Sequence, residues 1–222
     1  MRAVPTDLAR PFRLLYQGPR GAAPGVVNPY REEDPELDGR GAAKQRRRNL
    51  EAYVERVGSV RRLLLGEALG YRGGRFSGIA FTSERQLAGE EGRRLPWAVG
   101  PPFAATSCNP ALWLEPSGSV VWDALGGLPQ DTLLWNAFPW HPHAAQGPLS
   151  NRTPERPLWR ANLHVLEALL AALGPVRVLA VGRTSQAALA ELGVTAEALR
   201  HPAHGGASLF RSQLQAELAR RR

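Results

Sequence analysis

The stretch Leu63-Leu64-Leu65-Gly66-Glu67-Ala68-Leu69-Gly70-Tyr71-Arg72-Gly73-Gly74-Arg75-Phe76-Ser77-Gly78 decides how this chain is expected to fold. Three consecutive leucines after Val60 predict a short buried strand over residues 60–65. Gly66 ends that strand and Glu67 follows at once, in a turn whose glycines let the backbone bend tightly and approach a ligand. Open α/β sheets bind their ligands at the carboxyl ends of such strands. The alternative is a surface turn that happens to hold a glutamate. Neither a Walker A loop nor the G-x-G-x-x-G spacing is present.

The composition is that of a folded, basic protein. The 222 residues are 43% hydrophobic and 22% charged, with 28 Lys+Arg against 20 Asp+Glu and a net charge of +8. Lys44 is the only lysine. Arginine binds phosphate through two parallel hydrogen bonds and stacks on bases, so the charge favours a nucleic-acid partner, although GC-rich coding also enriches arginine. A single cysteine, Cys108, excludes an internal disulfide framework and a cysteine-ligated cluster.

No targeting or membrane segment is expected. No apolar run approaches 18 residues, and the N-terminus lacks the apolar core of a signal peptide. We therefore expect a cytoplasmic protein that does not enter membranes.

Strands and helices alternate along most of the chain. The expected strands are 60–65, 132–136, 176–182 and 198–200, and the expected helices are 44–57, a short one capped by Thr82 or Ser83, 117–125, 158–173, one from a cap at Thr184 or Ser185 to Leu192, and 207–219. Residues 93–116 are expected to be irregular. The alternation predicts a single-domain, three-layer α/β/α fold around a central, mostly parallel four-stranded sheet.

The N-terminal 42 residues differ from the rest of the chain. They are rich in proline, glycine, arginine and acids without a helical or strand period, which predicts an extended N-terminal arm before an α/β domain over 43–222. The basic run that follows, Lys44-Gln45-Arg46-Arg47-Arg48, is typical of a solvated helix face, and contact with phosphate is the alternative.

Polar residues follow three of the expected strands. Glu67, Asn136 and His201 come at the carboxyl ends of the first, second and fourth strands. Because these ends lie at one edge of a parallel sheet, the three side chains are expected to share one crevice. Taken singly, Asn136 could cap a turn and His201, which precedes a proline, could be a packed turn residue.

Four segments, in this order, resemble the uracil-DNA glycosylase superfamily. Gly66-Glu67-Ala68-Leu69-Gly70 is similar to its first motif, in the Gly-Glu-Ala-Pro-Gly form of the iron–sulfur branch. Gly74-Arg75-Phe76-Ser77-Gly78 is similar to the segment whose phenylalanine stacks on the flipped base. Leu133-Leu134-Trp135-Asn136 is similar to the strand whose asparagine reads uracil, and His201-Pro202-Ala203 to the His-Pro-Ser motif. The resemblance covers about residues 60–215.

The resemblance implies a monofunctional DNA glycosylase that acts on uracil or a related deaminated base, without a cofactor and as a monomer. It implies that Glu67 and His201 are catalytic and that Gly66, Ala68, Phe76 and Asn136 bind the base. The residues expected to contact DNA are Arg72, Arg75, Arg152, Arg200 and His204. Residues 203–210 are the candidates for filling the gap that the flipped base leaves.

The sequence departs from the superfamily pattern at several positions. Ala68 stands where the family often has an aspartate or asparagine that positions the water, and Leu69 replaces the following proline. Gly70 stands where strict uracil enzymes carry a tyrosine that excludes the methyl group of thymine. Ala203 replaces the serine of the second motif. The cysteines of the iron–sulfur branch are absent.

Two other functions remain open from the sequence. The first is a metal-dependent hydrolase in which His141, His143, His201 and His204 come together with Glu67 as a carboxylate ligand. The second is a DNA-binding member of the same fold that retains the pocket but is catalytically weak or inactive, because Ala68 offers no polar group.

Overall fold

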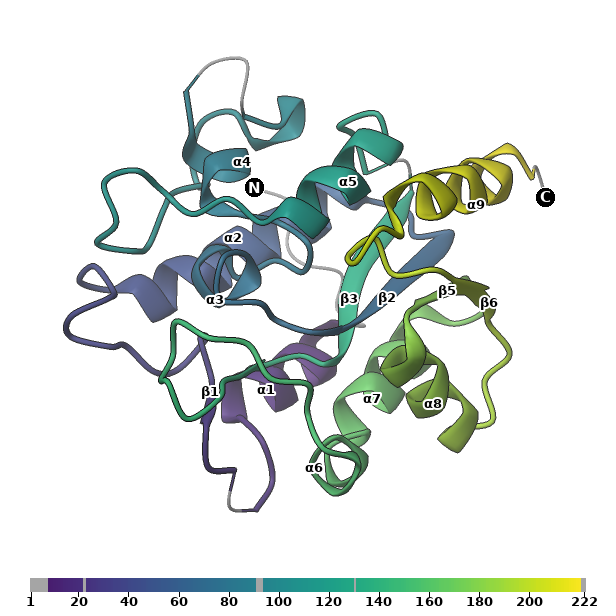
Figure 1. Ribbon diagram of the computed structural model, residues 1–222, viewed down its shortest axis with the longest axis horizontal. Helices are drawn as coiled ribbons and strands as arrows, with labels where there is room; N and C mark the ends of the chain where they lie inside the picture. The colour runs from purple at the N-terminus through teal and green to yellow at the C-terminus, as the bar shows by residue number, and fades with distance from the viewer. Residues whose placement is uncertain (1–7, 22, 91–93, 130, 221–222) are drawn as a thin grey trace.

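A four-stranded parallel sheet forms the centre of the computed structural model, which describes residues 8–21, 23–90, 94–129 and 131–220. The strand order is β3 (Thr132–Phe138), β2 (Arg62–Ala68), β5 (Arg177–Val181) and β6 (Glu197–Leu199) (Figure 1). The two inner strands, β2 and β5, are buried over most of their length because their central residues are apolar, as expected for a parallel sheet covered on both faces. The predicted α/β fold is confirmed.

Helices cover both faces of the sheet. Helix α8 packs on β2, β3 and β5, whereas α2 contacts β3, and α9 contacts β6 and α5. Figure 1 shows α7 and α8 below the sheet and α5 and α9 above it. The helices are α1 (Ala9–Gln17), α2 (Ala42–Val57), α3 (Gly74–Ser77), α4 (Glu84–Ala88), the 3₁₀ helix η2 (Pro96–Ala98), α5 (Pro116–Ala124), α6 (Arg156–Ala161), α7 (His164–Leu173), α8 (Arg183–Glu191) and α9 (Ala207–Ala219). In the described part of the chain, none of them has the length and apolar character needed to cross a bilayer.

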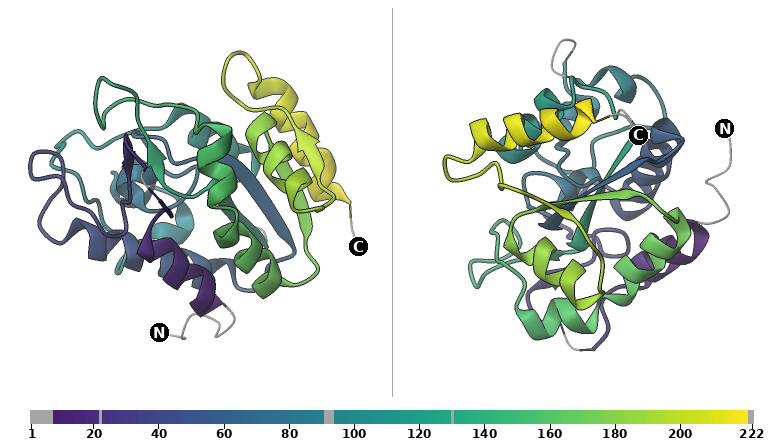
Figure 2. Two further views of the ribbon diagram at one scale, coloured as in Figure 1. Left: turned by 90° about the horizontal axis from the view of Figure 1, so that it is seen from below. Right: turned by 90° about the vertical axis from the view of Figure 1, so that its right-hand side faces the viewer.

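The N-terminal segment is more ordered than the sequence predicts. Helix α1 lies beside α7 in both views of Figure 2, and it buries Phe12 and Leu15. The Phe12 ring stacks on Trp135 of β3, with centroids 6.3 Å apart and planes 5° apart. Further on, β1 (Val26–Val27) pairs with β4 (His141–Pro142) in an antiparallel ribbon. The expectation of an extended arm without helix or strand was therefore wrong, and the division of the chain at residue 42 stays a prediction.

Two element boundaries differ from the predicted ones, one at a glycine and one at an asparagine. Strand β2 continues through Gly66 and Glu67 to Ala68, because Gly66 pairs with Asn136 and Ala68 with Phe138. The expected single helix over 158–173 is two helices, since Asn162 lies between α6 and α7 and its amide nitrogen bonds back to the Leu158 carbonyl. Ser83 caps α4 through a capping box, as predicted.

Candidate active site

A small cavity opens at the carboxyl edge of the sheet. It measures about 330 Å³, and Glu67 of β2, Asn136 of β3 and His201 after β6 all line it. An adjoining hollow of about 570 Å³ runs past the beginning of α8 and shares Glu67, His201 and His204 with it. The structure therefore brings together the three polar side chains that the sequence places at strand ends, and it leaves a wider groove beside them.

Glu67 is held in place by a residue of α8, the helix that follows the neighbouring strand β5. The hydroxyl group of Thr184, in the first turn of α8, donates a hydrogen bond of 2.5 Å to Glu67 Oε2. Thr184 or Ser185 was expected to cap α8, but Gly182 occupies the N-cap position. This bond engages a single oxygen of the carboxylate. The other oxygen, Oε1, has no partner among the described residues and can accept a proton from water.

Asn136 presents an unused amide to the cavity. Its side chain is 4% exposed and makes no hydrogen bond to any residue that the structure describes. Because the residue lines the cavity, water or a ligand there can satisfy its donor and acceptor. The amide nitrogen and oxygen of Asn136 are therefore available to hydrogen bond with a ligand in the cavity.

Phe81 and Gly66 complete the wall next to Asn136. Phe81 lines the cavity and has a left-handed backbone, with φ of 53°. A Cβ atom on Gly66 would lie 2.5 Å from Asn136 Oδ1 and 2.8 Å from Phe81 Cε2. Only glycine fits at position 66, because any side chain would displace the amide or the ring.

His201 has a defined proton position. The backbone N–H of Ala203 donates to His201 Nδ1 at 3.1 Å, so Nδ1 is the acceptor and Nε2 carries the proton of the neutral ring. Burial lowers the pKa of His201, and the repulsion from His204 and Arg200 acts in the same direction, while Glu67 opposes the shift. At neutral pH the ring is therefore uncharged, with Nε2–H as a donor.

Glu115 is a cavity residue that the sequence analysis missed. It precedes α5, lines the cavity, and has no side-chain hydrogen bond within the described part of the chain; Oε2 is shielded from solvent. Burial raises the pKa of Glu115 to about 7. Near neutral pH this carboxyl group therefore exists in both protonation states.

Phe76 and Arg75, which were predicted to face DNA, do not. Phe76 is fully buried, and its ring stacks on Trp113 at 5.7 Å with planes 8° apart; it does not line the cavity. Arg75 is also fully buried, and its guanidinium forms two hydrogen bonds of 3.0 Å to Asp38. Arg75 is therefore engaged by Asp38 and not exposed for DNA, and the Phe76 ring packs on Trp113 and not in the cavity, so the structure does not support either predicted role.

The remaining predicted DNA contacts lie around the mouth of the cavity or at the surface. Arg152 and His204 line the cavity, and Arg200 lines the adjoining hollow. Arg152 is also tied to Glu155 by an ion pair of 3.1 Å and to the carbonyl of His143. Arg72 is exposed and hydrogen bonds to the hydroxyl of Tyr71.

The histidines do not form the cluster that a metal-dependent hydrolase would need. His141 is buried, with Nδ1 2.8 Å from the Leu69 carbonyl and Nε2 2.9 Å from the Pro148 carbonyl. Burial lowers the pKa of His141 to about 4. Over residues 8–21, 23–90, 94–129 and 131–220, no three His, Cys, Asp or Glu side chains are grouped to hold a metal ion. The donor arrangement thus does not support the metal alternative.

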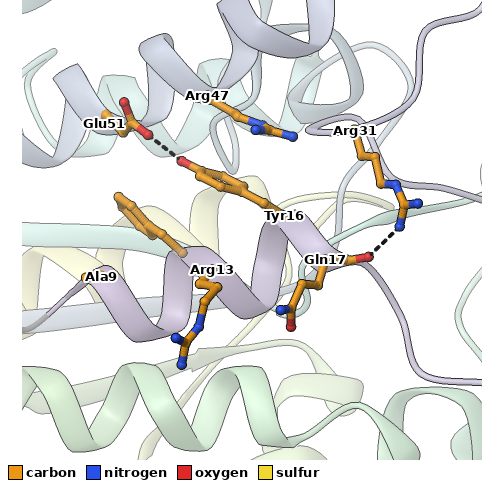
Figure 3. Close-up of a pocket in the computed structure, with 8 residues that line it drawn as sticks. Ala9, Arg13, Tyr16, Gln17, Arg31, Arg47 and Glu51 are labelled. Carbon is orange, nitrogen blue, oxygen red and sulfur yellow. Dashed lines mark hydrogen bonds between the residues drawn. The ribbon is translucent and has the colours of Figure 1, made fainter.

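A separate hollow of about 620 Å³ lies between α1 and α2, and it shares no residue with the cavity or the adjoining hollow (Figure 3). Four of its polar side chains, those of Tyr16, Glu51, Arg31 and Arg47, take part in contacts across it. Tyr16 donates to Glu51 at 2.9 Å, and Arg31 donates to the carbonyl of Gln17 at 3.2 Å. Arg47 lies over the Tyr16 ring at 4.7 Å. The contacts of Tyr16 with Glu51 and Arg47 connect α1 to α2.

The fold and the cavity together define an α/β protein with a cavity at the carboxyl edge of its parallel sheet. The family model described as the Uracil DNA glycosylase superfamily matches residues 55–218, and the chain belongs to this superfamily. A comparison with curated proteins finds no match. Members of the superfamily are typically DNA glycosylases, so membership implies glycosylase-like action on uracil or another deaminated base in DNA.

Proposed function

We propose that this protein is a monofunctional DNA glycosylase that hydrolyses the N-glycosidic bond of a flipped uracil or a related deaminated base. The observation that carries the proposal is the unpartnered amide of Asn136, which lies in the cavity beside the Phe81 ring and is unhindered because residue 66 is glycine. Chemistry on a base in duplex DNA requires the nucleotide to leave the stack, at a cost of a few kcal/mol. The cavity of about 330 Å³ is the place for it.

Asn136 reads the flipped base in this proposal, and Phe81 stacks on it. The amide nitrogen donates to O4 of uracil and the amide oxygen accepts from N3–H. Cytosine has an amino group at C4 and an unprotonated N3, so the same amide opposes it at both positions. Phe81 takes the stacking role that the sequence analysis assigned to Phe76, because Phe81 lines the cavity and Phe76 does not.

His201 and Glu67 assist bond cleavage. As the bond between the base and C1′ breaks, negative charge develops on the base, and the Nε2–H of neutral His201 donates a hydrogen bond to O2. The sugar becomes oxocarbenium-like, and an ionised carboxylate stabilises it or accepts a proton from the attacking water. Glu67 fits this role because Thr184 anchors Oε2 and leaves Oε1 free. The products are the free base and an abasic sugar.

Arginine and histidine side chains around the cavity hold the DNA backbone. Arg152, Arg200 and His204 surround the cavity and the adjoining hollow, and Arg72 is exposed on the glycine-rich turn. Residues 203–210 include the exposed Leu209 and remain the candidates for filling the gap in the duplex. Phosphate contacts of this kind supply affinity without sequence preference.

One observation favours a second function, a DNA-binding member of the fold without turnover. Ala68 lines the cavity, and its methyl group cannot position a water molecule. The two functions separate in a strand-cleavage assay. The purified protein is incubated with a duplex that contains one uracil, and abasic sites are then cleaved with alkali.

Glycosylase function predicts cleavage by the wild type, a large loss in Glu67→Gln, and no loss in the control Glu36→Gln, which changes an exposed glutamate in the N-terminal segment. Binding of the uracil duplex without cleavage by the wild type supports the binding function and contradicts the glycosylase.

A further inference from the structure

The hollow between α1 and α2 has no part in the proposed reaction. One face of α1 lines it, because Ala9, Phe12, Arg13, Tyr16 and Gln17 recur at the spacing of successive helical turns. Helix α1 packs against α7, and α2 faces this side of α1 across the hollow (Figure 3). The volume of about 620 Å³ lies within the range of about 300–1,000 Å³ that is typical of sites for small ligands.

The wall of the hollow combines aromatic rings with arginines. Phe12 stacks on Trp135 and lines the hollow. Tyr16 lies beside Phe12, with ring centroids 5.9 Å apart. Arg31 and Arg47 line the same hollow. Apolar surface with a few fixed polar groups is the usual composition of a site for a small organic molecule.

The guanidinium groups of Arg31 and Arg47 are held in position and keep most of their donors. Arg47 donates from Nε to the Tyr30 carbonyl at 2.5 Å and lies 4.7 Å from the centroid of the Tyr16 ring. Arg31 donates from Nη1 to the Gln17 carbonyl at 3.2 Å. An arginine that is already held loses little side-chain freedom when an anion binds. The remaining N–H groups of both arginines can therefore bind a phosphate group at a low entropic cost.

The carboxylate of Glu51 lies at the other end of the hollow. Figure 3 shows Glu51 next to the hydroxyl end of Tyr16, and Arg31 and Arg47 toward the backbone end of that residue. Glu51 Oε1 accepts a hydrogen bond of 2.9 Å from the Tyr16 hydroxyl, and Oε2 has no partner among the described residues. Burial raises the pKa of Tyr16, so its hydroxyl group stays protonated near neutral pH. The hollow thus offers an acceptor at one end and donors for phosphate at the other.

We propose that this hollow binds a free nucleoside monophosphate, with 2′-deoxyguanosine 5′-monophosphate (dGMP) as the probe. The phosphate group contacts Arg31 and Arg47, because guanidinium groups bind phosphate through parallel hydrogen bonds. The base covers the apolar surface of Phe12 and Tyr16. The 2-amino group of guanine donates to Glu51. The hollow shares no residue with the cavity at the carboxyl edge of the sheet, so the inference does not depend on the proposed function.

The test is isothermal titration calorimetry of the full chain, without DNA, with dGMP, deoxyguanosine and inorganic phosphate. dGMP should bind at least about tenfold more tightly than either fragment, because each fragment lacks the contacts at one end of the hollow. Arg31→Gln, at an exposed position, should weaken dGMP binding about tenfold to a hundredfold, the value of one charge-assisted hydrogen bond. Arg48→Gln is the matched control, because this exposed arginine of α2 does not line the hollow and its loss changes the net charge equally. Its affinity should stay within about twofold of the wild type.

A second variant tests the space in the hollow without a change in charge. Ala9 is exposed and lines the hollow from the first turn of α1. Ala9→Phe places a ring there and should also weaken dGMP binding. Thermal melts of each variant show whether it is folded. Wild-type affinity in a folded Ala9→Phe protein would contradict the proposed position of the base.

Three other results would overturn the inference. The first is a Kd for dGMP above about 1 mM, or equal affinities of Arg31→Gln and Arg48→Gln. The second is loss of dGMP binding in Asn136→Asp alone, which would place the nucleotide in the cavity at the carboxyl edge. The third is displacement of dGMP by a single-stranded oligonucleotide at the same nucleotide concentration, which would identify a surface for DNA. No base excision is measured, so failure of the proposed function would leave these results unchanged.

Discussion

The buried carboxyl group of Glu115 predicts an unusual dependence of stability on pH. Its pKa is raised from the ordinary value of 4.5 to about 7 because burial disfavours the charged form. Between these two pH values the folded protein binds more protons than the unfolded chain, so this group lowers the free energy of unfolding as the pH rises. One pKa unit corresponds to about 1.4 kcal/mol, so the loss approaches about 3 kcal/mol above pH 7.

Glu115→Gln removes the titration and keeps the shape. The difference in the free energy of unfolding between Glu115→Gln and the wild type is measured at pH 5 and at pH 8. This difference should be about 2–3 kcal/mol more favourable to the variant at pH 8. For a chain of this length the corresponding difference in Tm is about 5–10 °C. Urea unfolding followed by tryptophan fluorescence measures it at both pH values.

The comparison isolates Glu115 from other titrating groups. The lowered pKa of His141 acts in the opposite direction, because stability from a neutral buried histidine is lost as the pH falls from about 6.5 to about 4. It is present in both proteins and cancels. Glu36→Gln, at an exposed position, is the matched control and should show the same small effect at both pH values. A Glu115→Gln effect that is equal at pH 5 and pH 8 would refute the assignment of a buried, unpartnered carboxyl group.

Three further outcomes are expected. Phe76→Ala should lower the free energy of unfolding by about 3–5 kcal/mol, because the ring is fully buried against Trp113; a thermal melt with unchanged Tm and weakened DNA binding would instead restore the base-stacking role. Gly66→Ala should weaken binding of an abasic-analogue duplex, since its methyl group must displace the Asn136 amide or the Phe81 ring; an affinity within twofold of the wild type would argue against this wall as the base site. Binding to undamaged DNA should weaken with salt at a log–log slope of about −0.9 per phosphate contacted, and titrations that show no salt dependence would count against a nucleic-acid substrate.

The sequence predicts the sheet and the strand-end residues because both depend on local patterns. An apolar run such as Leu63–Leu65 predicts a buried strand from the local sequence alone, whichever strands it pairs with. Parallel pairing then places Glu67, Asn136 and His201 at one edge. The order of the chain is sufficient to predict that these three residues meet.

The residues that the sequence analysis misplaced depend on contacts between distant segments. Phe76 and Phe81 both follow glycines in one turn, and only the packing of Phe76 on Trp113 decides which ring faces the cavity. Arg75 is buried because it pairs with Asp38, which is far away in the sequence and also pairs with Arg46.

The roles of Thr184 and Glu115 were missed for a different reason. The sequence around Thr184 predicts a helix cap, and the sequence around Glu115 predicts no role for it. A threonine at the start of a helix is a typical cap, which concealed the bond from Thr184 to Glu67. Glu115 lies in a proline-rich stretch without periodicity, so no local pattern indicates that its carboxyl group lines the cavity.

The central proposal is that Asn136 selects the base, whereas Glu67 acts on the sugar or the attacking water. One measurement tests it most directly. Excision of uracil and of cytosine is measured on matched duplexes for the wild type, Asn136→Asp and Glu67→Gln. An aspartate at position 136 accepts from the amino group of cytosine, so the uracil-to-cytosine ratio should fall about tenfold to a hundredfold, the value of one two-point base contact. Glu67→Gln should slow the reaction while leaving that ratio within about threefold, because Glu67 acts on the sugar or the water. If both substitutions change rate and ratio in the same proportion, or if neither changes anything in a folded protein, the account is contradicted.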